Sequence, residues 1–162
     1  MLDLLLAKEL PLTDEEYLES LVFLLTNENL KSRAMELLKK IPESTKSTYI
    51  EKSEANPRVA YFLILEGLNW KNSKILSRAI RNQMLPYEFL AKIAEKGDIN
   101  ALEMLLDNQI KLIAYPEIME AMEKNPVINN FVRGKIKEIR EFYLKADKAE
   151  ETEQQNSLGV FA

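Results

Sequence analysis

One stretch of the sequence carries four cations at helical spacing. Lys71, Lys74, Arg78 and Arg81 follow one another at intervals of 3, 4 and 3 residues, and Trp70 stands directly before them. On a helix this spacing places all four side chains along one face. Such a face can bind an acidic helix of a partner protein, a phosphate group or a nucleic-acid backbone. The alternative is a solvated outer surface, which is what most charge runs are.

Carboxylates are the second residue type that could do chemistry. Asp14, Glu15 and Glu16 are adjacent, and Glu117 lies three residues before Glu120. Paired carboxylates serve as general acid and base in hydrolytic enzymes. However, the helix dipole favours negative charge in the first turn of a helix, which explains the first group without catalysis. No pair is distinguished from the others, so an enzyme with carboxylate acid/base chemistry is only a remote alternative.

The chain has no histidine and no cysteine. Their absence removes the commonest general base, the thiol nucleophile, the disulfide bond and the usual ligands of transition metals. The 4 glycines are too scattered for a phosphate-binding loop, and no acidic loop has the spacing and turn glycine of a calcium site. We therefore expect no catalytic residue, no metal and no cofactor, and a chain that is not an enzyme.

The composition is that of an ordinary soluble domain. Of 162 residues, 46% are hydrophobic and 30% charged, and the net charge of −4 gives the whole chain no attraction to nucleic acid or anionic lipid. No run reaches the roughly 18 apolar residues that a membrane span requires. The first ten residues include Asp3, Lys8 and Glu9, which is unlike a signal peptide. We expect a cytoplasmic protein without membrane contact.

Apolar residues recur with helical spacing along nearly the whole chain, and no convincing strand pattern is present. Thr13 with Glu16 predicts a capping box, and Pro42 should end a helix that begins near Glu28. The last helix should be longer, from about 129 to 146. Four further residues have the side chains and positions of helix N-caps: Ser44, Asn56, Asn72 and Asp98.

Asparagines recur at a nearly fixed interval. Asn29, Asn56, Asn82 and Asn108 are separated by 27, 26 and 26 residues, which is typical of stacked helical repeats. A column of asparagines can bind a peptide backbone. We favour the alternative, that asparagine tolerates the left-handed conformation at helix ends and caps the next helix. The expected fold is all-α: a short right-handed superhelix of ten to eleven short helices with a longer C-terminal helix, in one domain over 1–146.

Two sequence features resemble known repeat proteins. Residues 85–98, LPYEFLAKIAEKGD, and the Asn-Pro pairs at Asn56 and Asn125 resemble units of bacterial leucine-rich repeat variants and HEAT-like α-solenoids. The resemblance covers about residues 46–140 and implies a right-handed stack of short helices used for binding. The founding variant-repeat family is associated with a cysteine-bound cluster, which does not carry over to a chain without cysteine. Some HEAT-like DNA glycosylases bind duplex DNA in a basic channel, but this chain has no second comparable basic helix.

The segment 147–162 lacks a helical stripe, and we expect it to be disordered. It ends in three apolar residues, Leu158, Val160 and Phe161, on an acidic tether. These residues are a candidate docking motif. The alternative is an unconstrained chain end.

Together these features predict a non-enzymatic adaptor or scaffold of helical-repeat type. The candidate binding residues are Trp70, Lys71, Lys74, Arg78 and Arg81, and the expected partner is another protein with an acidic surface. A nucleic-acid-binding repeat protein that uses residues 71–81 is the second hypothesis.

Overall fold

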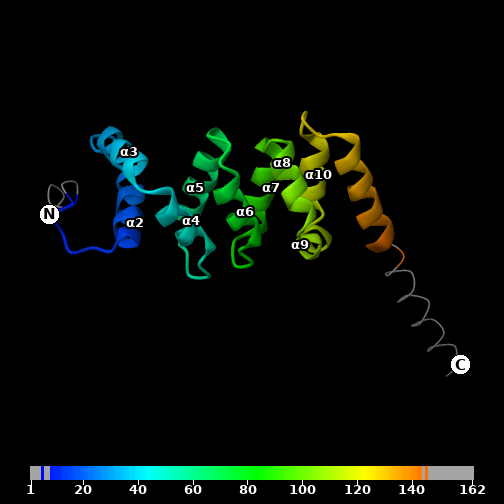
Figure 1. Cartoon of the computed structure of the whole chain (residues 1–162), viewed down its shortest axis with the longest axis horizontal. Helices are drawn as coiled ribbons and strands as arrows, with labels where there is room; N and C mark the ends of the chain where they lie inside the picture. Colours follow the sequence, from blue (N-terminus) through cyan, green and yellow to red (C-terminus); the bar gives the residue numbers. More distant parts are fainter. Residues whose placement is uncertain (1–4, 6–7, 144, 146–162) are drawn as a thin grey trace, which may run out of the picture. The chain divides into compact units, whose positions relative to one another are not determined.

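The computed structural model describes residues 5, 8–143 and 145, and these are all-helical, with no β-strand among them (Figure 1). A longer C-terminal helix covers 130–143. The prediction of an all-α protein of about ten helices is therefore confirmed. No helix in the described ranges combines the length and apolar character needed to span a bilayer. The labelled helices are α2 (Asp14–Leu24), α3 (Lys31–Lys40), α4 (Glu43–Glu51), α5 (Pro57–Asn69), α6 (Ser73–Arg81), α7 (Tyr87–Lys96), α8 (Ile99–Leu106), α9 (Gln109–Ala114) and α10 (Glu117–Lys124).

The chain divides into two compact units, unit 1 over Met1–Phe89 and unit 2 over Leu90–Ala162, with the boundary inside α7. The predicted tail, 147–162, lies outside the described residues. The three residues of the candidate docking motif, Leu158, Val160 and Phe161, lie there too.

Several predicted helix starts are confirmed because their capping is local. Thr13 and Glu16 form both hydrogen bonds of a capping box at α2, each 3.1 Å long. The side chains of Asn56, Asn72 and Asp98 accept from backbone amides in the first turns of α5, α6 and α8.

Two predicted boundaries are wrong. Helix α4 begins at Glu43, so Ser44 lies inside its first turn. Pro42 takes the N-cap position instead, with an extended backbone at ψ 141° whose carbonyl accepts from Lys46 N. Helix α3 begins at Lys31 rather than near Glu28, because a turn closed by Leu30 N and the carbonyl of Asn27 precedes it.

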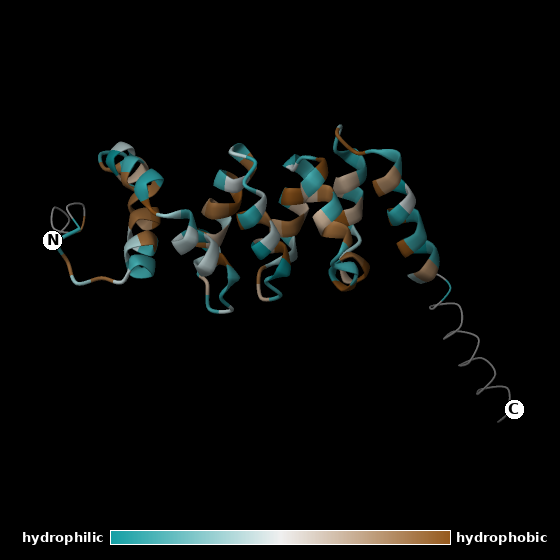
Figure 2. Ribbon diagram, in the orientation of Figure 1, coloured by the Kyte–Doolittle hydropathy of each residue, from teal (hydrophilic) through white to brown (hydrophobic). Residues whose placement is uncertain are grey.

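The core of unit 1 lies between α2, α3, α4, α5 and α6. Helix α4 packs against α6, α5 packs against α6, and α2 packs against α3. Figure 2 shows hydrophobic and hydrophilic residues alternating along these helices, as expected when one face of each is buried. Gly67 lets α5 approach α6 closely, because a Cβ there would lie 3.2 Å from Leu76 Cδ2. The core residues include Leu18, Leu21, Leu38, Ile50, Leu63, Ile64, Ile75 and Ala79.

In unit 2, α9 packs against both α8 and α10. The C-terminal helix buries Val132, Ile136 and Ile139 along one face, whereas Tyr143 near its end is 41% exposed. An ion pair between Arg140 and Glu123 joins this helix to α10.

Two buried asparagines have the same hydrogen-bonding role, one in each unit. Asn82 follows α6, and its side-chain amide donates to the carbonyls of Ile50 (2.8 Å) and Lys52 (2.9 Å) at the end of α4. Asn125 follows α10, and its amide donates to the carbonyls of Ala94 (3.0 Å) and Gly97 (2.8 Å) at the end of α7.

The side-chain oxygen of each of these two asparagines accepts from the amide two residues on. Each asparagine therefore clamps the ends of two helices together. We call these two residues, 43 positions apart, the asparagine clamps.

The four asparagines that recur at intervals of 26 or 27 residues do not have the same structural role. Asn56 and Asn108 are N-caps, Asn82 is a clamp, and Asn29 lies in an exposed turn. Asparagine was also expected to adopt the left-handed conformation, and this is wrong for the described part of the chain. The only non-glycine residues with positive φ there are Lys8 and Lys71.

Candidate binding hollow around Trp70

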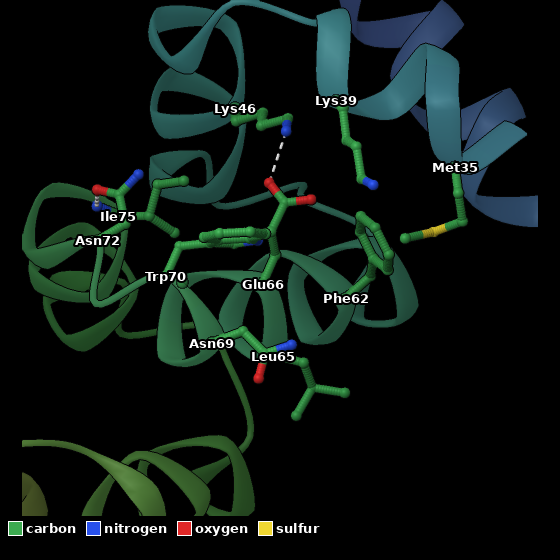
Figure 3. Close-up of a pocket in the computed structure, with 11 residues that line it drawn as sticks. Met35, Lys39, Lys46, Phe62, Leu65, Glu66, Asn69, Trp70, Asn72 and Ile75 are labelled. Atoms are coloured by element: carbon green, nitrogen blue, oxygen red, sulfur yellow. Dashed lines mark hydrogen bonds and ion pairs between the residues drawn. The ribbon is translucent and has the colours of Figure 1, made fainter.

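A hollow of about 400 Å³ opens in unit 1 between α3, α4, α5 and the turn that leads into α6 (Figure 3). Most of its wall comes from the last two turns of α5. Its lining residues are Met35, Lys39, Lys46, Phe62, Leu65, Glu66, Gly67, Asn69, Trp70, Asn72 and Ile75. The hollow thus combines aromatic and aliphatic side chains with two lysines and one glutamate.

An ion pair crosses the wall of the hollow. Lys46 on α4 is only 6% exposed, and its amine donates to Glu66 Oε1 on α5 at 2.5 Å. Removing an ammonium group from water costs several kcal/mol, and a partner at hydrogen-bond distance offsets this cost. The pair therefore fixes both side chains, and the Glu66 carboxylate is already engaged.

Trp70 forms one rim of the hollow and is 74% exposed, which is unusual for the largest apolar side chain. In Figure 3 its ring lies on one side of Glu66 and the ring of Phe62 on the other, and Lys39 extends from α3 toward this space. Leu65 adds a further exposed apolar surface at 37%. The rim is therefore apolar and open to solvent.

A tight turn holds Trp70 in place. Asn72 N donates to the carbonyl of Gly67 at 2.8 Å, the long bond of a Schellman helix end. This geometry requires a left-handed residue in between, and Lys71 occupies that position with φ 52°. A lysine there costs about 1–2 kcal/mol relative to a right-handed conformation. The side chain of Asn72 then accepts from Ile75 N at 3.3 Å and begins α6.

The predicted basic stripe is not uniform. Arg78 Nη1 lies 2.6 Å from Glu51 Oε2, so its charge is engaged within unit 1. Lys71, Lys74 and Arg81 are exposed. Of the five residues predicted to bind a partner, Trp70 lines the hollow, while the four cations do not.

Sequence reasoning missed Lys39, Lys46 and Glu66. Lys46 precedes the buried residues Tyr49 and Ile50 by three and four positions, which places it on the apolar face of α4. A charge at such a position signals a buried ion pair, although the partner cannot be identified from spacing alone. No group of three or more acidic residues suited to a metal ion occurs among the described residues.

Tyr49, on α4, has a raised pKa. Burial raises the pKa of its phenol to about 12, and nearby Glu19 and Glu15 act in the same direction. Its oxygen accepts from Asn56 N at 2.9 Å, which opposes the increase in pKa. The buried tyrosine thus holds Asn56, the N-cap of α5, against the core.

Comparison with known proteins identifies no family: no family model, no curated protein and no solved structure matches this chain.

Proposed function

We propose that this chain is a non-enzymatic, protein-binding module of helical-repeat type. The asparagine clamps support the repeat. Asn82 and Asn125 each follow a helix, and the side-chain amide of each donates to two carbonyls at the end of an earlier helix. The interval of 43 residues is that of HEAT and armadillo repeats, about 40–47 residues.

Other residues recur at a similar interval. Ile41-Pro42 and Leu85-Pro86 precede α4 and α7, and Asn56 and Asp98 cap α5 and α8. Helices α4, α5 and α6 thereby correspond to α7, α8 and α10. A repeat of 43 residues replaces the 26-residue interval in this proposal.

The exposed indole of Trp70 in the hollow is the observation that carries the binding proposal. Tryptophan is enriched among residues that dominate protein–protein affinity, and burying it removes a large apolar surface from water. Lys39 lines the same hollow, and Lys71 and Lys74 follow Trp70 along the chain. An apolar surface with cationic side chains beside it suits a protein partner with an acidic surface.

Two features favour a protein partner over the alternatives. Arg78 is paired with Glu51, which weakens the basic stripe as a nucleic-acid contact. Glu66 is paired with Lys46, so the one carboxylate of the hollow is engaged and poorly placed to act as a general base.

The test is affinity capture with the wild-type chain, the variant Trp70→Ala and the control Phe142→Ala. Phe142 is a suitable control because it is a similarly exposed aromatic, at 72%, in unit 2. We expect a specific protein to be retained by the wild type and by Phe142→Ala and to be lost with Trp70→Ala. If Trp70→Ala retains the same protein as the wild type, the hollow around Trp70 is not the binding site. Retention of DNA or RNA that falls steeply with salt would favour the nucleic-acid alternative.

A further inference from the structure

The hollow around Trp70 has an excess of positive charge. Lys39 and Lys46 provide two ammonium groups against the single carboxylate of Glu66, which Lys46 already contacts. The Lys39 amine extends toward the hollow beside Glu66 and Phe62 (Figure 3). A ligand that fits this surface needs a carboxylate for Lys39 and an apolar side chain for Trp70 and Phe62.

The chain itself contains a segment with this chemistry. Residues 147–162 carry four carboxylates and one lysine, followed within a few residues by Leu158, Val160 and Phe161. The segment and the hollow are therefore opposite in charge, and each provides large apolar side chains.

We infer that residues 147–162 of a second copy of the chain occupy the hollow of unit 1. Phe161 or Leu158 would cover the exposed indole of Trp70, and the acidic residues would meet Lys39 in the hollow and Lys71 and Lys74, which follow Trp70 along the chain. This inference rests on the proposed role of the hollow as a binding site. It adds that self-association competes with the external partner for the same surface.

Trp70 is the chain's one tryptophan and therefore reports on the hollow by fluorescence. The probe is a synthetic peptide of residues 147–162. It is titrated into the full chain that carries Leu158→Asp and Phe161→Asp, because these changes should prevent the chain's own segment from competing for the hollow. We expect a saturable blue shift of the Trp70 emission as the indole leaves water. The affinity should fall as salt increases.

Charge reversal locates the site. Lys39→Glu should weaken peptide binding by about tenfold or more, as expected for loss of an attraction and gain of a repulsion. The matched control is Lys40→Glu, an adjacent exposed lysine on α3 that does not line the hollow. The inference would be overturned if Lys39→Glu and Lys40→Glu weaken peptide binding equally. It would also be overturned if the Trp70 emission does not change at any peptide concentration.

Sedimentation equilibrium supplies the second measurement. The average mass of the wild-type chain should rise with concentration, while that of Leu158→Asp/Phe161→Asp should stay at one chain. A wild type that stays at one chain would overturn the involvement of a second copy, even if the emission of Trp70 differs between the two proteins. The proposed function has a separate outcome, because capture of an external partner through Trp70 can succeed when both of these measurements fail.

Discussion

The ammonium group of Lys46 lies 2.5 Å from the carboxylate of Glu66, and the two residues belong to different helices, α4 and α5. Both side chains are largely removed from solvent, at 7% and 17% exposed. Each charge is therefore tolerated mainly because the other is present. The pair also affects which charges of the hollow could bind a ligand. Because Lys46 is engaged with Glu66, Lys39 is the lining lysine that could pair with a carboxylate of a ligand.

Replacing Glu66 with glutamine should destabilise the protein by about 3 kcal/mol, because the buried ammonium of Lys46 loses its counter-charge. Urea denaturation measures the change. The double variant Lys46→Met/Glu66→Met removes both charges and should be close to wild type in stability. If the double variant is as unstable as Glu66→Gln, packing rather than charge pairing holds α4 and α5 together here.

Replacing either asparagine clamp with alanine should lower the free energy of unfolding by about 2–4 kcal/mol. Asn82→Ala removes the donor for two carbonyls of unit 1, and Asn125→Ala does the same in unit 2. Each buried group left without a partner costs about 1–3 kcal/mol. Thermal or urea unfolding provides the measurement, with the exposed Asn29→Ala as a control that should change stability by less than about 0.5 kcal/mol.

Gly97→Ala and Gly134→Ala should act in opposite directions. A Cβ at Gly97 would lie 2.6 Å from the carbonyl oxygen of Ile93 and 2.7 Å from the Cβ of Ala101, so the backbone has to shift. We expect a loss of about 1–3 kcal/mol. A Cβ at Gly134, in the C-terminal helix, meets nothing within 4 Å, and alanine should stabilise that helix by about 1 kcal/mol. Circular dichroism melting curves distinguish the two, and stabilisation by Gly97→Ala would refute the close approach.

Stability should fall in alkaline solution through Tyr49. Its pKa is about 12 in the folded protein and 10.0 for an ordinary tyrosine, so the unfolded chain loses its proton first. The contribution of Tyr49 is complete below about pH 10 and is lost as the pH rises toward 12. Tyr49→Phe removes this ionisable group, so its free energy of unfolding should decline less over that range, by about 1–2 kcal/mol.

Urea titrations at several alkaline pH values, compared between wild type and Tyr49→Phe, give the two slopes. All other residues are the same in the two proteins, so their contributions cancel in the comparison. Identical slopes would show that burial does not hold this phenol in its protonated form.

The all-helical fold and most helix starts could be predicted from the sequence because their causes are local. A capping side chain and the amide that it satisfies are two or three residues apart, as with Thr13 and Glu16 or Asn72 and Ile75. The sequence pattern predicts only that Pro42 ends a helix, whereas its extended backbone also begins the next one.

The candidate site depended on contacts that spacing does not reveal. Trp70 stands beside the cations in the sequence, yet Lys39 and Lys46, which line the same hollow, come from other helices. The ion pair between Lys46 and Glu66 spans 20 residues of sequence. The clamp of Asn82 reaches carbonyls 30 and 32 residues away, so its regular spacing from other asparagines was misleading.

Asn72 ends one helix with its backbone and begins the next with its side chain, through Gly67 and Ile75 respectively. The two bonds are separate, but both depend on the position of Asn72, so fraying of either helix at this junction moves a residue that the other helix uses. The two helices are thus expected to open as one cooperative unit that includes the turn holding Trp70. If Trp70 binds a partner as proposed, the partner would meet an indole whose supporting backbone needs no further ordering, which would reduce the entropic cost of association.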